Sequence, residues 1–259
     1  MLRVDDIKRI GRNYEMNVGL AEKDYIVEWL LKILYKSRIC RRIVFKGGTA
    51  IKKIYYPQTW RFSHDLDFTS SLDAEIIKKE FEKIFTGIEK KSEIKFSFKS
   101  FHITKGSIIA NIQFLGHLNM KNRIRLDISL DEPILTKPKE IEVESKYPDV
   151  KKYKVIVYSL EEILAEKVRS ILQRGKSRDY YDVWMLLNVK KFDMRKIKEL
   201  IIEKCKTRGI RFSVSKIFER DILNEVSKYW EVGLKELVRY LPDFNYVINE
   251  LKDKLKEIK

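Results

Sequence analysis

Aspartates alternate with apolar residues in the segment DLDF, and this alternation constrains the fold more than any other feature of the chain. Successive side chains of a β-strand point to opposite faces, so Asp65 and Asp67 lie on one face and the apolar residues on the other. The segment IRLDISLD repeats the pattern and places Asp127 on its polar face. If the two strands are neighbours, the three carboxylates meet on one face of a sheet.

Three carboxylates a few ångströms apart repel one another unless a cation neutralises them. Hard divalent cations prefer carboxylate oxygens, and a pair of such ions promotes phosphoryl transfer. We therefore expect Asp65 and Asp67 to hold Mg²⁺, with Mn²⁺ as the alternative ion. We expect Asp127 either to complete this metal site or to act as a general base. A solvated strand residue remains the alternative interpretation of Asp127.

A Gly-Gly-Thr turn precedes the first of these strands, within the segment FKGGTAI. Glycine lets the backbone approach a ligand closely, and amides at the start of a helix bind phosphate. We expect Thr49 to cap the short helix that follows. The alternative interpretation of the Gly-Gly-Thr segment is an ordinary strand-to-helix turn. Lys46 and Arg61 are expected to contact either the polyphosphate or the acceptor. The nucleotide-binding group that we predict consists of Lys46, Gly47, Gly48, Thr49, Arg61 and Ser63.

A second group of charges lies in the helical sequence of residues 159–187. Lys167 falls within the apolar arc of the first helix, where an ammonium needs an anion nearby. Asp179 and Asp182 lie on one side of the next helix, and we expect either of them to pair with Lys167. The alternatives are a phosphate contact for Lys167, a lysine that reaches the edge of the arc, and Arg178 as the partner of Asp182.

The remaining patterns predict an α+β domain followed by a helical domain. Residues 1–40 and 74–91 have helical periodicity, and three alternating segments between residues 94 and 132 predict antiparallel strands. A further strand is expected at residues 153–157, and the chain after Ser159 is helical. The two domains that we predict are residues 1–155 and 156–259.

The charge balance favours an anionic partner, because 54 Lys and Arg residues against 38 Asp and Glu residues give a net charge of +16. Positive surfaces attract phosphate-rich molecules. The alternative explanation for the many charged residues is a surface of the kind found in thermophilic proteins. No apolar run approaches the roughly 18 residues of a membrane span, and the N-terminus lacks the apolar core of a secretory signal. A cytoplasmic protein without a membrane span is therefore expected.

These segments resemble the AbiEii/AbiGii-type nucleotidyltransferase toxins, a family that includes the MenT toxins and acts in bacterial and archaeal toxin–antitoxin pairs. The resemblance covers about residues 40–190 and rests on FKGGTAI, RFSHDLDF and LAEKVRSILQRGKSRDYYDVWML. It implies an α+β fold in which a nucleotidyltransferase-like mixed sheet with flanking helices is followed by a C-terminal helical bundle that completes the active cleft. It also implies Mg²⁺, a nucleoside triphosphate (NTP), a cognate antitoxin, and transfer of a nucleoside monophosphate to a protein or to RNA such as a tRNA 3′ end.

The functional pattern of that family combines a Gly-Gly-(Ser/Thr) turn, an Asp-x-Asp strand, a helical lysine and an Arg-Asp-x-x-Asp segment. All four occur here, the last as Arg178-Asp179 with Asp182. Two other functions stay open: a non-enzymatic module that binds RNA or a partner, and a metal-dependent nuclease. The catalytic residues that we predict are Asp65, Asp67, Asp127, Lys167, Asp179 and Asp182.

Overall fold

The computed structural model describes residues 1–258, and the chain divides into two compact units. We call them the sheet unit and the helical unit. Two short segments, Gln58–Phe62 and Leu135–Lys137, belong to the helical unit together with the residues from Ser159 onward. The sheet unit consists of Met1–Pro57, Ser63–Ile134 and Pro138–Tyr158.

The sheet unit is built on a mixed sheet which, within the described residues, has seven strands in the order β3-β4-β5-β2-β1-β7-β6. Strand β2 pairs with β1 in antiparallel and with β5 in parallel orientation, which confirms that the two aspartate-bearing strands are neighbours. The strands are β1 (Ile43–Lys46), β2 (Leu66–Ser70), β3 (Lys95–Ile103), β4 (Ser107–Leu115), β5 (Lys121–Ser129), β6 (Lys139–Glu144) and β7 (Lys152–Val157).

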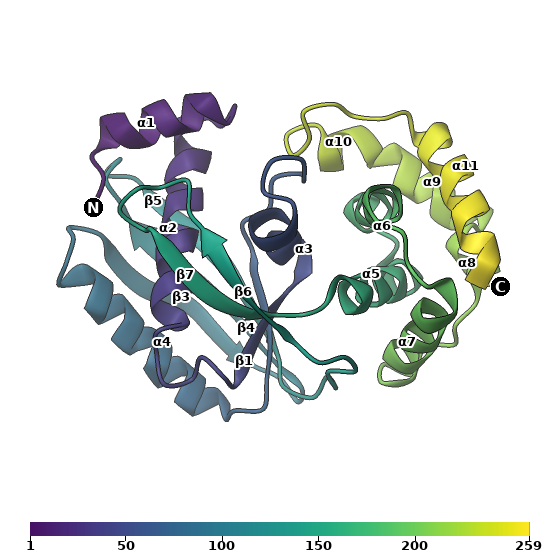
Figure 1. The fold of residues 1–259 in the computed structure, drawn as a ribbon, viewed down its shortest axis with the longest axis horizontal. Helices are drawn as coiled ribbons and strands as arrows, with labels where there is room; N and C mark the ends of the chain where they lie inside the picture. The colour runs from purple at the N-terminus through teal and green to yellow at the C-terminus, as the bar shows by residue number, and fades with distance from the viewer. Residues whose placement is uncertain (259) are drawn as a thin grey trace. The chain divides into compact units, whose positions relative to one another are not determined.

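One face of this sheet forms the core of the unit, because buried positions alternate with more exposed ones along strands such as β4 and β5. Leu66 and Phe68 of β2 and Leu126 of β5 are at most 1% exposed. Full burial of each such side chain contributes about 1.5–3 kcal/mol. Two helices, α2 (Val18–Leu34) and α4 (Ala74–Glu89), pack against the sheet (Figure 1). The unit also contains α1 (Val4–Asn13), α3 (Gly47–Ala50) and a π-helical turn at Ile51–Tyr55.

A buried ion network joins α2 to the π-helical turn. The Lys53 ammonium lies 2.8 Å from Asp24 Oδ1 and 3.1 Å from Glu28 Oε1, and Lys146 and the Tyr147 hydroxyl both contact Asp24 at 2.9 Å. Burial by itself raises the pKa of Asp24, but the nearby cations outweigh it and lower that pKa. The network therefore keeps Asp24 ionised and fixes the chain that follows the glycine turn.

The first helix of the helical unit is α5 (Leu160–Arg174). Ser159 caps it by accepting a hydrogen bond from the Glu162 amide. Gly175 ends this helix in the left-handed conformation, with φ +54°. A fully buried lysine, Lys204, lies 2.8 Å from Glu162 and ties α7 to α5. The other helices are α6 (Ser177–Val189), α7 (Met194–Lys206), α8 (Val214–Ile217), α9 (Arg220–Lys228), α10 (Trp230–Leu234), α11 (Phe244–Lys254) and a 3₁₀ turn at Leu255–Ile258.

Three details differ from the sequence predictions. Thr49 does not cap α3, because the helix starts at Gly47 with Lys46 as its N-cap residue. Strand β6 was not predicted, because its sequence KEIEVE is mostly exposed and its apolar alternation is short. Most of the helix after the turn is π-helical. None of the helices within residues 1–258 is both long and apolar enough to cross a membrane.

Candidate active site

The aspartates of β2 and β5 lie side by side in the sheet unit. Asp67 is directly opposite Asp127 in the parallel pair, and directly opposite Lys46 of β1 on its other side. Neighbouring strands are about 4.8 Å apart, so these three side chains form one row across the sheet. Asp65 precedes Asp67 by two residues, on the same face of the chain.

The glycine turn lies against this row. Gly47 has φ +77°, a conformation that favours glycine. A Cβ atom at this position would be 2.3 Å from Asp67 Oδ2 and 2.9 Å from Asp67 Cγ. Two features therefore restrict position 47 to glycine: its backbone conformation and the carboxylate beside it. The two motifs singled out in the sequence are thus in direct contact.

Asp127 is held by an arginine of its own strand. Arg125 Nε donates to Asp127 Oδ2 at 2.9 Å, and the two side chains are 53% and 34% exposed. The hydrogen bond to Asp127 raises the pKa of Arg125, and the charges of Asp65 and Asp67 act in the same direction. Arg125 therefore supplies positive charge to all three aspartates. Strand alternation places Arg125 on this face, but no role was predicted for it.

Lys46, predicted to bind nucleotide, has protein partners in the structure. Its ammonium lies 2.7 Å from Glu132 Oε2 and 3.2 Å from the Ser129 hydroxyl, and it is largely buried. The Thr49 and Ser63 hydroxyls share a hydrogen bond of 2.8 Å. These contacts position the polar groups around the turn, while their predicted role in nucleotide binding stays a prediction.

A further cation near this row was not predicted. Lys23 of α2 is half-buried, and burial lowers the pKa of its ammonium while the charge of Asp65 opposes that effect. The proximity of Lys23 to Asp65 depends on how α2 packs against the sheet, which no local pattern in the sequence reveals.

The donor chemistry of this row suits a hard divalent cation. Asp65, Asp67 and Asp127 offer carboxylate oxygens alone, which are the ligands that Mg²⁺ prefers. Within residues 1–258, no three His, Cys, Asp or Glu side chains are already arranged to hold a metal ion. Instead, Asp127 faces Arg125. All three residues fit Mg²⁺ by type, and the register places Asp67 and Asp127 side by side.

The predicted charges of the helical unit form one closed cluster. Lys167 lies 2.9 Å from Asp182 Oδ2 and 3.6 Å from Asp179 Oδ1, which confirms the predicted pairing. Arg61 Nε and Nη2 donate to the two oxygens of Asp182 at 2.7 and 2.8 Å. Arg61, rather than Arg178, is therefore the arginine partner of Asp182. Arg174 makes the corresponding pair with Asp179, at 2.8 and 2.9 Å.

Both aspartates of this cluster are fully buried yet remain ionised. Burial raises the pKa of Asp182, but Arg61 and Lys167 lower it further than burial raises it. The same balance, with Lys167 and Arg174, lowers the pKa of Asp179. Asp179 and Asp182 therefore act on their neighbours, because they hold the Lys167 ammonium and the Arg61 guanidinium in place. The Arg61 side chain is 4% exposed and contacts Asp182, a partner that was not predicted.

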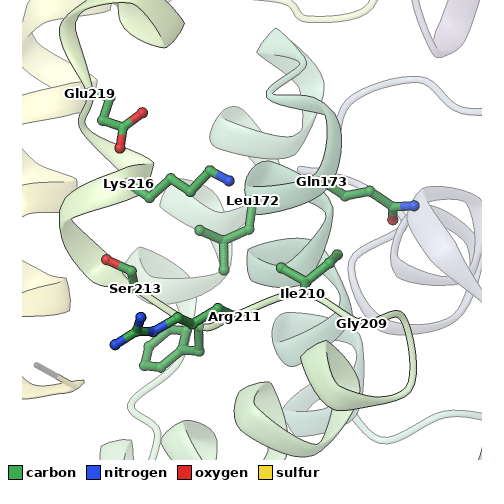
Figure 2. A pocket seen from close by; sticks show the side chains of 9 residues that line it. Leu172, Gln173, Gly209, Ile210, Arg211, Ser213, Lys216 and Glu219 are labelled. Atoms are coloured by element: carbon green, nitrogen blue, oxygen red, sulfur yellow. The ribbon is translucent and has the colours of Figure 1, made fainter.

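The helical unit also has a cavity of about 610 Å³ (Figure 2). Figure 2 shows it between the end of α5 and the segment that leads into α8. None of the predicted site residues lines this cavity. Its lining residues are Leu172, Gln173, Gly209, Ile210, Arg211, Phe212, Ser213, Lys216 and Glu219.

Comparison with known proteins adds a family and a fold. A family model described as "Nucleotidyl transferase AbiEii toxin, Type IV TA system" matches residues 29–256. An uncharacterised protein of Aquifex aeolicus (strain VF5) is 26% identical over 202 residues, which cover 74% of this chain and 83% of the relative. The structure of MenT4, a nucleotidyltransferase toxin of Mycobacterium tuberculosis H37Rv, matches with a TM-score of 0.77 at 16% identity, covering 100% of this chain and 91% of that chain. This likeness confirms the predicted α+β fold.

Proposed function

Because the chain belongs to the AbiEii family of nucleotidyltransferase toxins of type IV toxin–antitoxin systems, we propose that it transfers a nucleoside monophosphate from an NTP to an acceptor hydroxyl. The acceptor that we propose is RNA, such as a tRNA 3′ end. A net charge of +16 supports this choice, since a positive surface attracts polyphosphates. A protein acceptor is the alternative, and a cognate antitoxin is the expected partner.

The observation that carries the proposal is the contact between the glycine turn and the aspartate row. Asp67 lies opposite Asp127 and against Gly47. A triphosphate bound at the turn would therefore lie directly beside these carboxylates. Asp65, Asp67 and Asp127 are the residues that would hold Mg²⁺. When bound, Mg²⁺ neutralises phosphate charge and polarises the reacting oxygens.

The proposed reaction is an in-line displacement at the α-phosphorus. The acceptor hydroxyl oxygen forms a bond to this phosphorus, while the bond to the bridging oxygen of the β-phosphate breaks. Pyrophosphate leaves with that electron pair, and the Asp127 carboxylate accepts the hydroxyl proton. In the helical unit, Asp179, Asp182 and Arg61 fix Lys167, the lysine that the family pattern assigns to the catalytic set.

A labelling experiment tests this function. The purified protein is incubated with total RNA, Mg²⁺ and each α-³²P-labelled NTP in turn, and labelled products are separated on a denaturing gel. We expect one NTP to label RNA, and Asp67→Asn to reduce labelling by about 100-fold or more, because one charged ligand is lost. Asp73→Asn is the matched control, since it removes one exposed carboxylate shortly after β2 and should leave labelling unchanged.

The other outcomes separate the rival functions. Shortening of RNA in the absence of any NTP would identify a nuclease. A binding module would be identified by two results together. No label would be transferred to RNA, protein or a small acceptor, and Asp67→Asn would leave RNA binding unchanged. Either identification contradicts nucleotidyl transfer.

A further inference from the structure

The polar face of the sheet continues beyond the aspartates across β5, β4 and β3. We call this surface the open face. Its positions follow from the pairing register: Gln113 of β4 lies opposite Arg123 of β5, and Asn111 lies opposite Arg125. In the next row His102 of β3 lies opposite Ile109, which lies opposite Asp127. All of these residues belong to the sheet unit.

Three cations precede Asp127 along β5, at every second residue. Arg125, Arg123 and Lys121 share the face of Asp127 and are exposed. Alternate strand residues are about 6.6 Å apart, a repeat close to the distance between successive phosphates of an extended single strand. Arg125 is engaged with Asp127, but within residues 1–258 neither Arg123 nor Lys121 forms an ion pair. Both cations are therefore available to bind an external anion.

Apart from the half-buried Ile109 and Leu115, the rest of the open face carries mainly uncharged polar side chains on β4 and β3. Asn111 donates a hydrogen bond of 2.9 Å to the Ser100 hydroxyl, Gln113 is half-buried, and the His102 ring is exposed. Amides and hydroxyls offer both donors and acceptors, and an exposed ring offers a stacking surface. Protein interfaces, in contrast, are centred on buried aromatic and apolar anchors. The composition of the open face therefore favours a nucleic acid over a protein.

We propose that the open face binds the single-stranded 3′ end of an RNA acceptor. Arg123 and Lys121 contact successive phosphates, the bases lie over β4 and β3, and the terminal hydroxyl reaches Asp127. The proposal rests on the proposed nucleotidyl transfer and names the route by which its acceptor enters. A single strand fits better than a duplex, because it can lie extended along one strand of the sheet with its bases turned toward the neighbouring strands.

Binding measured without NTP and without metal tests the route separately from the reaction. A short fluorescein-labelled single-stranded RNA with a free 3′ hydroxyl is titrated with protein, and anisotropy gives Kd at several salt concentrations. For the double variant Lys121→Gln/Arg123→Gln we expect Kd to rise about tenfold. The slope of log K against log salt should become less steep by about 1.4, because each phosphate of a single strand that the protein no longer neutralises removes about 0.7 from the slope.

A matched control removes the same charge elsewhere. Lys36 and Lys79 are exposed, and Lys79 lies on α4, which packs on the core side of the sheet. Lys36→Gln/Lys79→Gln should leave both Kd and the salt slope as in the unmodified protein. Conversely, Gln113→Lys adds a cation next to Arg123 on the open face and should tighten binding and steepen the slope.

Failure of the proposed binding route and failure of the proposed nucleotidyl transfer give different results. If the protein labels RNA but the two double variants have equal Kd and equal salt slopes, the route is wrong and the transfer stands. If no labelling occurs but Lys121→Gln/Arg123→Gln selectively weakens RNA binding, the transfer is wrong and the binding face stands. Equal affinity for a duplex of the same sequence overturns the single-strand geometry. In the labelling reaction, Lys121→Gln/Arg123→Gln should raise KM for RNA about tenfold and leave KM for NTP unchanged.

Discussion

Replacing Gly47 by alanine tests how tightly the glycine turn is coupled to the Asp67 carboxylate. The alanine methyl group would lie 2.3 Å from Asp67 Oδ2, 2.9 Å from Cγ and 3.0 Å from Cβ. The carboxylate oxygen can rotate away, but Cγ and Cβ move only if the side chain or β2 moves. The substitution therefore displaces Asp67 from its place opposite Asp127.

The magnitude follows from two contributions. A non-glycine residue at φ +77° costs about 1–2 kcal/mol, and the added methyl group in a filled space costs about 1–3 kcal/mol, partly relieved by rotation of the carboxylate. A net loss of about 2 kcal/mol in the free energy of unfolding lowers Tm by about 4–8 °C in a domain of this size. Nucleotide labelling of RNA should fall by much more than the folded fraction, because the displaced group is a proposed metal ligand.

Thermal unfolding and the RNA-labelling reaction are the two assays, and Gly87→Ala is the control. A Cβ atom at Gly87, within α4, would have no atom within 4 Å. Gly87→Ala should therefore keep full labelling and gain up to about 1 kcal/mol. In the double variant Gly47→Ala/Asp67→Gly the close approach is absent, so its stability should exceed the sum of the two single effects by about 1–2 kcal/mol. If Gly47→Ala matches Gly87→Ala in both Tm and labelling, the coupling does not exist.

Three further predictions concern stability and metal dependence. Asp182→Ala should destabilise the protein by about 3–5 kcal/mol in urea unfolding, because it leaves Arg61 and Lys167 buried without this carboxylate. The control Asp243→Ala removes the exposed N-cap of α11 and should cost only about 1 kcal/mol. Equal losses in the two variants would contradict a structural role for the cluster. Burial lowers the pKa of His64 to about 4, so the unfolded chain binds this proton first as pH falls. About 2 kcal/mol of stability should therefore be lost between pH 7 and pH 5, and an unchanged pH slope in His64→Gln would refute this. Treatment with EDTA should abolish labelling of RNA and added Mg²⁺ should restore it, whereas labelling that persists in EDTA would exclude a metal-dependent reaction.

The features of the site that were predictable from sequence depend on local periodicity. Strand alternation placed Asp65, Asp67 and Asp127 on one face, and the register confirms that Asp67 and Asp127 are neighbours. Helical spacing placed Lys167 in an apolar arc and led to its pairing with Asp182. In these cases the position of a side chain on its own element decides which surface it reaches.

Other features depend on contacts between distant segments, and local patterns do not contain them. Lys53 pairs with Asp24 across 29 positions of the chain, and Arg61 reaches Asp182 across 121. Both pairings were invisible because charged residues are common throughout the sequence. The role of Arg125 was within reach, since residues two apart on a strand share a face, but the pattern alone does not show that its guanidinium turns toward Asp127.

The central claim is that the acidic residues of β2 and β5 hold a divalent cation beside the glycine turn. A crystal soaked with Mn²⁺ and a non-hydrolysable NTP analogue, measured by anomalous diffraction at the manganese edge, tests it directly. We predict a peak within coordination distance of Asp65, Asp67 and Asp127 and next to the triphosphate, with Arg125 turned away from Asp127. A fully occupied nucleotide with no anomalous peak at these carboxylates, or with its manganese bound to other residues, would contradict the claim.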